Sequence, residues 1–139
     1  MIIYILFNNY DDTIEGVYTE SGKRAKEDEL LKHAIELRDK EVARLSAEIT
    51  EFKEMRQPYI DKAEALLPKE LEAKQNDSGG AYKLIKKERK RLLKQAEHIT
   101  FDIHKLEDKI LRYQRLLKSE VINCFGRQYD WEEHYLEGE

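Results

Sequence analysis

The sequence contains few of the residues that form disulfides or bind metal ions. It has one cysteine, Cys124, so no disulfide can form within the chain, and its four histidines show no metal-site spacing. Scarce cysteine gives no sign of a disulfide-stabilised secreted domain, which favours a cytoplasmic location. We therefore expect neither a bound metal nor a cofactor.

Long apolar runs are missing as well. The chain has no stretch of about 20 apolar residues, so we expect no association with a membrane. The apolar residues 1–7 lack a basic flank and a small-residue cleavage site, and turn-forming residues 8–12 follow them directly. This start predicts a β-strand and not a signal peptide.

Two long stretches carry apolar residues at mostly alternating steps of three and four. They run over residues 25–67 and 82–121, and a turn-forming cluster over residues 75–80 separates them. A period of 3.5 residues winds two helices around each other, and a glycine-rich turn makes the pair antiparallel. The expected seam consists of Leu31, Ile35, Val42, Leu45, Ile49, Phe52, Tyr59, Ala63 and Leu66, facing Ile85, Leu92, Ala96, Ile99, Ile103, Leu106, Ile110, Tyr113 and Leu117.

Proline and glycine set the expected limits of these helices. Pro58 removes one helical hydrogen bond and predicts a kink. Pro68 predicts the end of the first helix and a connector over residues 69–81. Gly126 predicts the end of the second helix, which we expect near Asn123.

The two chain ends predict a small sheet. Residues 2–7 and 13–18 form an expected hairpin, Thr19 an expected N-cap, and residues 129–137 an expected closing strand. The predicted fold class is therefore α+β, with an antiparallel sheet built from both ends and a coiled-coil hairpin inserted between them. The expected division is a sheet domain over residues 1–20 plus 124–139 and a two-helix stalk over residues 21–123, with its loop near residues 68–81.

The first strand is apolar on both faces. One face carries Ile3, Ile5 and Phe7, and the other carries Ile2, Tyr4 and Leu6. A single helical layer covers only one face of a sheet, and monomers seldom leave such a patch in water. We therefore expect self-association, as a homodimer or a larger homo-oligomer.

Both chain ends resemble a family of small phage and bacterial domains of unknown function. The similar segments are Ile3-Tyr4-Ile5-Leu6, Tyr10-Asp11-Asp12, Ile14-Glu15-Gly16-Val17-Tyr18 and the aromatic, acidic run from Tyr129 to Glu137. In that family a β-hairpin leads into a helix, and an aromatic-acidic strand closes the sheet. The resemblance covers the first 26 residues and the last dozen, implies a viral or mobile-element origin, and carries no activity with it.

Charge is distributed unevenly along the chain. Residues 1–20 hold four carboxylates and no lysine or arginine, and residues 123–139 hold five carboxylates against one arginine. The middle of the chain therefore carries the excess of cations. They are densest in one helical segment, residues 83–94, which holds Arg89 and the six candidates for nucleic-acid contact Lys83, Lys86, Lys87, Lys90, Arg91 and Lys94.

This basic segment has two interpretations. Its cations could bridge the phosphates of RNA or DNA, including ribosomal RNA. Alternatively they form a solvated helix face whose ion-pair partners are carboxylates such as Glu64, Glu70 and Glu72 of the other helix.

The acidic ends also carry aromatic residues. Tyrosine and tryptophan dominate binding hot spots, and carboxylates around them steer basic partners. Edge-strand protection by charge is the alternative explanation. The residues predicted to bind a partner are Tyr10, Asp11, Asp12, Tyr129 and Trp131.

No set of residues has the composition and spacing of a catalytic site. We expect a non-enzymatic protein that acts by binding a macromolecule of a host cell, inhibition being one outcome. Two alternatives stay open: contact with nucleic acid through the basic segment, and capture of a small nucleotide-like ligand between subunits.

Overall fold

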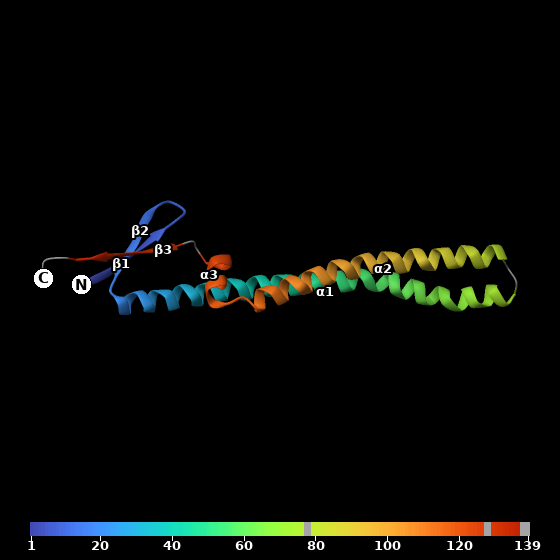
Figure 1. Ribbon diagram of the computed structural model, residues 1–139. Helices are drawn as coiled ribbons and strands as arrows, with labels where there is room; N and C mark the ends of the chain where they lie inside the picture. The colour runs from blue at the N-terminus through green and yellow to red at the C-terminus, as the bar shows by residue number, and fades with distance from the viewer. Residues whose placement is uncertain (77–78, 127–128, 137–139) are drawn as a thin grey trace. The chain divides into compact units, whose positions relative to one another are not determined.

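The computed structural model describes residues 1–76, 79–126 and 129–136, and it confirms the α+β class (Figure 1). The elements in chain order are β1 (Ile2–Asn8), β2 (Thr13–Tyr18), α1 (Glu20–Gln75), α2 (Gly79–Gln114), α3 (Lys118–Phe125) and β3 (Tyr129–Tyr135). The chain divides into two compact units. The first comprises Met1–Val42 with Arg112–Glu139, and the second comprises Ala43–Leu111.

Strand β1 lies at the centre of a three-stranded antiparallel sheet with the order β2-β1-β3. Leu6 of β1 pairs with Gly16 of β2 on one side and with Trp131 of β3 on the other. Just beyond β3, the Leu136 N–H donates to the Met1 carbonyl at 2.8 Å, which extends the pairing by one more bond. The three predicted strands are confirmed, but β3 ends at Tyr135, before the expected end at residue 137, which lies outside the described residues.

A β-bulge changes which face of the sheet carries each side chain of β2. Ile5 pairs with Val17 and Phe7 pairs with Ile14, so β2 contributes one more residue than β1 over this stretch. Directly paired residues share a face of the sheet. The extra residue therefore brings Ile14 and Val17 onto the same face, although a spacing of three would place them on opposite faces of a regular strand.

The opposite face of the sheet lies against helical residues of the same unit. Leu6 is 0% exposed, and the Lys23 ammonium of α1 lies 4.5 Å from the centre of the Tyr4 ring. The rings of Tyr18 and Trp131 meet edge to face at 5.5 Å on this side. These contacts form the core of the sheet unit, to which Ala34 and Val121 also belong as fully buried residues.

The start of α1 follows the predicted capping. The Thr19 hydroxyl accepts a hydrogen bond from the Gly22 N–H at 3.3 Å, and Glu20 occupies the first turn, where a negative charge favours the helix dipole. Because only Thr19 separates β2 from α1, the helix begins directly at the end of the sheet.

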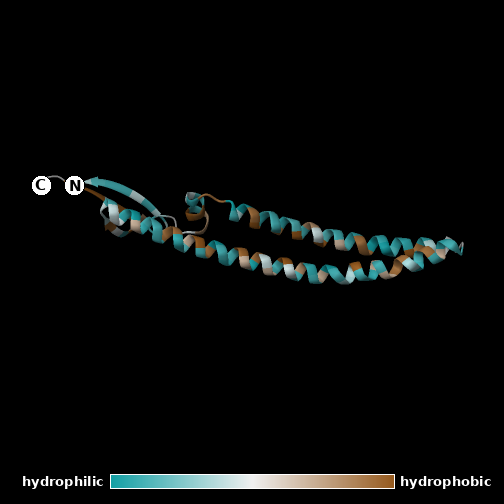
Figure 2. Ribbon diagram, turned by 90° about the horizontal axis from the view of Figure 1, so that it is seen from below, coloured by the Kyte–Doolittle hydropathy of each residue, from teal (hydrophilic) through white to brown (hydrophobic). Residues whose placement is uncertain are grey.

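In the second unit, α1 and α2 pair in antiparallel fashion. Arg89 binds Glu70, and the Arg56 guanidinium donates to the Thr100 hydroxyl at 2.9 Å. In these two pairs the residue of α2 has the higher number where the residue of α1 has the lower one, as antiparallel helices require. Figure 2 shows apolar residues recurring among polar ones on both helices. The buried seam residues include Leu45, Ile49, Ala63, Leu92, Ala96 and Ile103, as the heptad pattern predicted.

The prediction that Pro68 ends the first helix was wrong. Helix α1 runs through both Pro58 and Pro68 to Gln75, and most of the expected connector is helical. Each proline removes one backbone hydrogen bond, but the burial of residues on both sides of Pro68, including Ala63 and Glu70, favours continuation of the helix. Tertiary packing thus outweighs the local preference of proline.

The second helix, in contrast, is interrupted where continuity was expected. Helix α2 ends at Gln114, and α3 begins at Lys118. The Leu117 N–H donates to the Glu120 carboxylate at 2.9 Å, which caps α3, and the rings of Tyr113 and Phe125 meet edge to face at 4.9 Å across the turn. Gly126 ends α3 as predicted, and its N–H donates to the Ile122 carbonyl at 2.8 Å.

We predict that Gly16→Ala destabilises the sheet unit by about 1 kcal/mol. A Cβ atom on Gly16 would lie 2.7 Å from the Tyr18 ring, so the ring must leave its contact with Trp131. Thermal unfolding measures the loss. Gly80→Ala is the matched control, because no atom lies within 4 Å of its added Cβ, and alanine favours the helix. Equal melting temperatures for Gly16→Ala and the wild type would contradict the packing described.

We predict that Arg89→Met destabilises the protein by about 3 kcal/mol, because it leaves the carboxylate of Glu70 buried without a partner. Glu70 is 5% exposed and binds the Arg89 guanidinium. Denaturant unfolding of the single variant and of Glu70→Leu with Arg89→Met provides the test. The double variant should recover most of the loss. A single variant as stable as the wild type would show that the pair contributes nothing.

Candidate interaction surfaces

One face of the sheet is apolar and open within its unit. It consists of Ile3, Ile5 and Phe7 of β1 with Ile14 and Val17 of β2, and we call these five residues the open face. The β1 residues are half-buried, whereas Ile14 is 60% and Val17 57% exposed. The open face thus presents aliphatic and aromatic side chains to solvent on a rigid, paired backbone.

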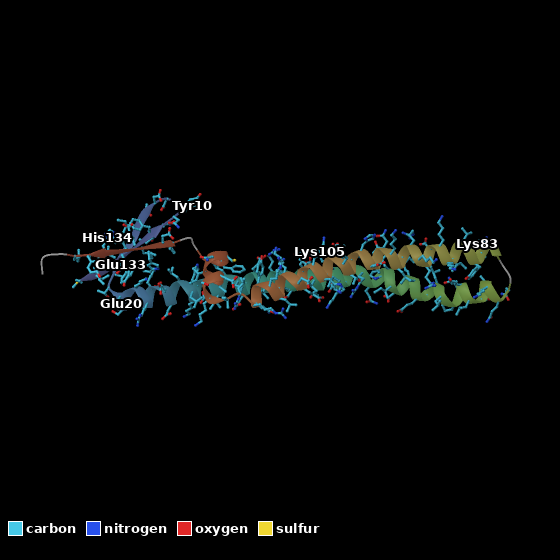
Figure 3. All side chains as sticks on the ribbon, viewed as in Figure 1. Tyr10, Glu20, Lys83, Lys105, Glu133 and His134 are labelled. Carbon is cyan, nitrogen blue, oxygen red and sulfur yellow. The ribbon has the colours of Figure 1, made fainter. Side chains whose placement is uncertain are left out.

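Charged residues of β3 border the open face on one side. The pairing places Asp130, Glu132 and His134 next to Phe7, Ile5 and Ile3, respectively, so the three side chains share the open face. His134 Nε2 lies 2.8 Å from Glu132 Oε1, close enough for an ion pair when the imidazole is protonated. Labels in Figure 3 locate His134 on this strand.

The predicted partner-binding residues separate into two groups. Tyr10, Asp11 and Asp12 lie together in the loop between β1 and β2, where Tyr10 is 95% exposed (Figure 3). Tyr129 and Trp131 are half-buried and pair with Asn8 and Leu6, which places them on the helix-covered face. The loop and these two aromatic residues therefore belong to different surfaces.

Hydrogen bonds fix the loop between β1 and β2. The Asp11 carboxylate accepts from the Thr13 hydroxyl at 2.6 Å and from the Thr13 N–H at 3.2 Å. Both bonds lower the pKa of the Asp11 carboxyl, and the bond from the hydroxyl has the larger effect. Asp12 adopts a φ of 56°, a left-handed conformation that aspartate tolerates better than most residues. The loop thus presents the exposed Tyr10 from a defined backbone.

The predicted basic segment lies on α2. Its residues Lys83, Lys86, Lys87 and Lys90 line a shallow surface groove. Arg91 differs from these lysines, because it binds Glu88 at 2.6 Å and thereby lowers the pKa of that carboxyl. Of the carboxylates expected to neutralise the segment, Glu70 is bound by Arg89.

A small cavity lies in the sheet unit, between the early turns of α1 and the region of α3 and β3. It measures about 170 Å³, and its polar lining includes Lys26, Glu29, His33 and Tyr129. Ligand pockets usually measure about 300–1,000 Å³, so this cavity is small for a nucleotide-like ligand within one chain.

Neither a metal site nor a membrane span is formed by residues 1–76, 79–126 and 129–136. In this part of the chain no cluster of three or more histidine, cysteine or carboxylate side chains is arranged to hold a metal ion. The helices described there include none with the length and apolar character that crossing a bilayer requires.

No family model matches this chain, and no curated protein or solved structure matches it either. The resemblance to small phage domains therefore rests only on the residues quoted for it. The viral or mobile-element origin that it implies remains a prediction.

Sequence reasoning missed two residues of the open face and one exposed aromatic residue. Ile14 and Val17 are three apart, and only the bulge places them beside Ile5 and Phe7. Phe101, which is 58% exposed on α2, fits the outer side of the heptad pattern and could have been found from its position. The strand register could not be read from the sequence in the same way.

We predict that Thr13→Val raises the pKa of Asp11 towards its ordinary value, because the variant loses the hydroxyl donor. Carboxyl titration followed by NMR measures this pKa. A lowered pKa in the folded protein stabilises the fold above the unfolded-state pKa, and this contribution is lost as the pH falls through the folded-state value. The stability difference between wild type and Thr13→Val should therefore shrink below about pH 4. An unchanged Asp11 pKa in the variant would contradict the loop geometry.

Proposed function

We propose that the protein is a non-enzymatic interaction protein that self-associates through the open face of its sheet. The observation that supports this proposal is the grouping of five apolar side chains on a sheet face that the described residues of its own unit cover only in part, leaving Ile14 and Val17 more than half exposed. Such faces are usually buried against another surface. None of the five side chains can transfer a proton or attack a substrate, so the face is suited to binding alone.

A second copy of the chain suits this surface better than an unrelated partner. A two-fold axis parallel to the strands, between β1 and β2, would set Ile5 and Phe7 of one copy against Val17 and Ile14 of the other. Both copies then use the same surface patch, as an isologous interface requires. Two sheets can pack in this aligned way at a separation of about 10 Å.

The charges of β3 fit the edge of such an interface. With the axis between β1 and β2, β3 packs against no strand of the partner, and Asp130 and Glu132 stay in water at the rim. An apolar centre with a charged rim is the usual anatomy of a specific interface. The contact is small, because only β1 and β2 of each copy pack against the partner, so we expect a dissociation constant in the micromolar range.

This interface leaves other surfaces of the chain unused. The loop with Tyr10, Asp11 and Asp12 is not needed for it, and neither is any residue of α2. We propose that the assembly acts by binding a further macromolecule through such surfaces, as expected for a protein that acts on a host component.

We predict that the wild type exceeds one chain per particle in sedimentation equilibrium at micromolar concentrations, and that Ile14→Glu with Val17→Glu is a monomer. Both residues are more than half exposed, so the double variant should stay folded. The buried carboxylates would destabilise the dimer strongly.

Met55→Glu is the control, because Met55 is 57% exposed like Val17 but lies on α1. It should associate as the wild type does. A wild-type monomer, or an Ile14→Glu with Val17→Glu variant that associates normally, would overturn the proposed interface.

A further inference from the structure

One side of α2 carries a continuous row of lysines. Lys83, Lys87, Lys90 and Lys94 follow one another at steps of four, three and four residues, and Lys86 lies beside them. Residues at these steps share one side of a helix. We call these five residues the lysine row, and it belongs to the second compact unit of the chain.

Among the described residues, the lysine row makes no ion pair and is mostly exposed. Arg89 and Arg91 of the same segment bind Glu70 and Glu88, whereas none of the five lysines forms an ion pair with a residue that the structure describes. Four of the lysines are exposed, and only Lys86 is half-buried, with its ammonium 5.6 Å from the Tyr82 ring centre. Five like charges this close repel one another, so a bound polyanion would stabilise them.

The length of the row fits a run of phosphates. Eleven residues separate Lys83 from Lys94, which is a rise of about 16 Å along the helix. A row of this length can follow several consecutive phosphates of one strand. The first carboxylate on this side of the helix, Glu97, comes after the row ends.

Aromatic rings lie at both ends of the lysine row. Tyr82 precedes it, and Phe101 follows two turns after Lys94 on the same side of α2. Phe101 is 58% exposed, and the Lys105 ammonium lies 4.5 Å from its ring centre (Figure 3 labels Lys83 and Lys105). An exposed ring beside cations is the arrangement on which unpaired bases stack.

We propose that the lysine row, with Phe101, binds single-stranded nucleic acid. The lysines neutralise successive phosphates, and the exposed ring stacks on a base that a duplex would hide. An acidic protein segment would use the charges but gain little from the ring, which makes it the less favoured ligand. The proposal does not depend on the sheet interface, because all of its residues lie on α2.

The test is fluorescence anisotropy of the full chain with a labelled single-stranded oligonucleotide, its duplex and a polyglutamate peptide. The single strand should bind, with log K falling against log salt at a slope of about −3 between about 50 and 200 mM. Lys87→Glu, Lys90→Glu and Lys94→Glu together should reduce the slope by about 2 and the affinity by more than about tenfold. Phe101→Ala should lower the affinity for the single strand by about tenfold and leave the affinity for the duplex unchanged.

The matched control is Lys32→Glu, Lys40→Glu and Lys53→Glu, which changes the net charge equally at exposed lysines of α1. For this control, log K should fall more steeply with log salt than it does for the first triple variant. Circular dichroism establishes that all variants are folded. No binding at about 50 mM salt, equal losses in both triple variants, or polyglutamate binding as tight as the single strand would overturn the proposal. An affinity unaffected by Phe101→Ala would overturn the single-strand assignment.

Discussion

The central position of β1 constrains the rest of this structure. Its two neighbours come from opposite ends of the chain, since β2 follows it directly and β3 ends at Tyr135. The residues between β2 and β3 must therefore leave the sheet and return to it. Two helices paired in antiparallel fashion achieve this, and their seam buries apolar side chains along the way. The helical hairpin is thus inserted in the sequence between β2 and β3.

The same constraint leaves one face of the sheet open. Because only Thr19 separates β2 from α1, the helix begins at the sheet, and its Lys23 lies over Tyr4 on the face of Leu6. The other face receives no helix from the described residues of this unit, and the bulge in β2 adds Ile14 and Val17 to its apolar surface. The proposed interface therefore follows from how the chain leaves its own sheet.

Patterns of local residues predicted most of the fold. The strands, the Thr19 cap, the seam and the end of α3 at Gly126 follow from alternation, heptads and capping. Sequence reasoning failed where distant contacts decide: packing around Glu70 keeps α1 helical through Pro68, and the contact of Tyr113 with Phe125 accompanies a break that the heptads do not show. For the candidate surfaces, the lysines were predictable as a cluster, but which of the cations pair with carboxylates depends on side-chain contacts across helices.

The proposed dimer depends on contact between the open faces of two chains. The most direct measurement is an isotope-filtered NMR experiment on a sample that mixes labelled and unlabelled chains, which detects contacts between copies only. We expect intermolecular contacts from the Val17 methyl groups to Ile5 and from Ile14 to Phe7. Association without these contacts, or with intermolecular contacts confined to α1 and α2, would contradict the proposed dimer.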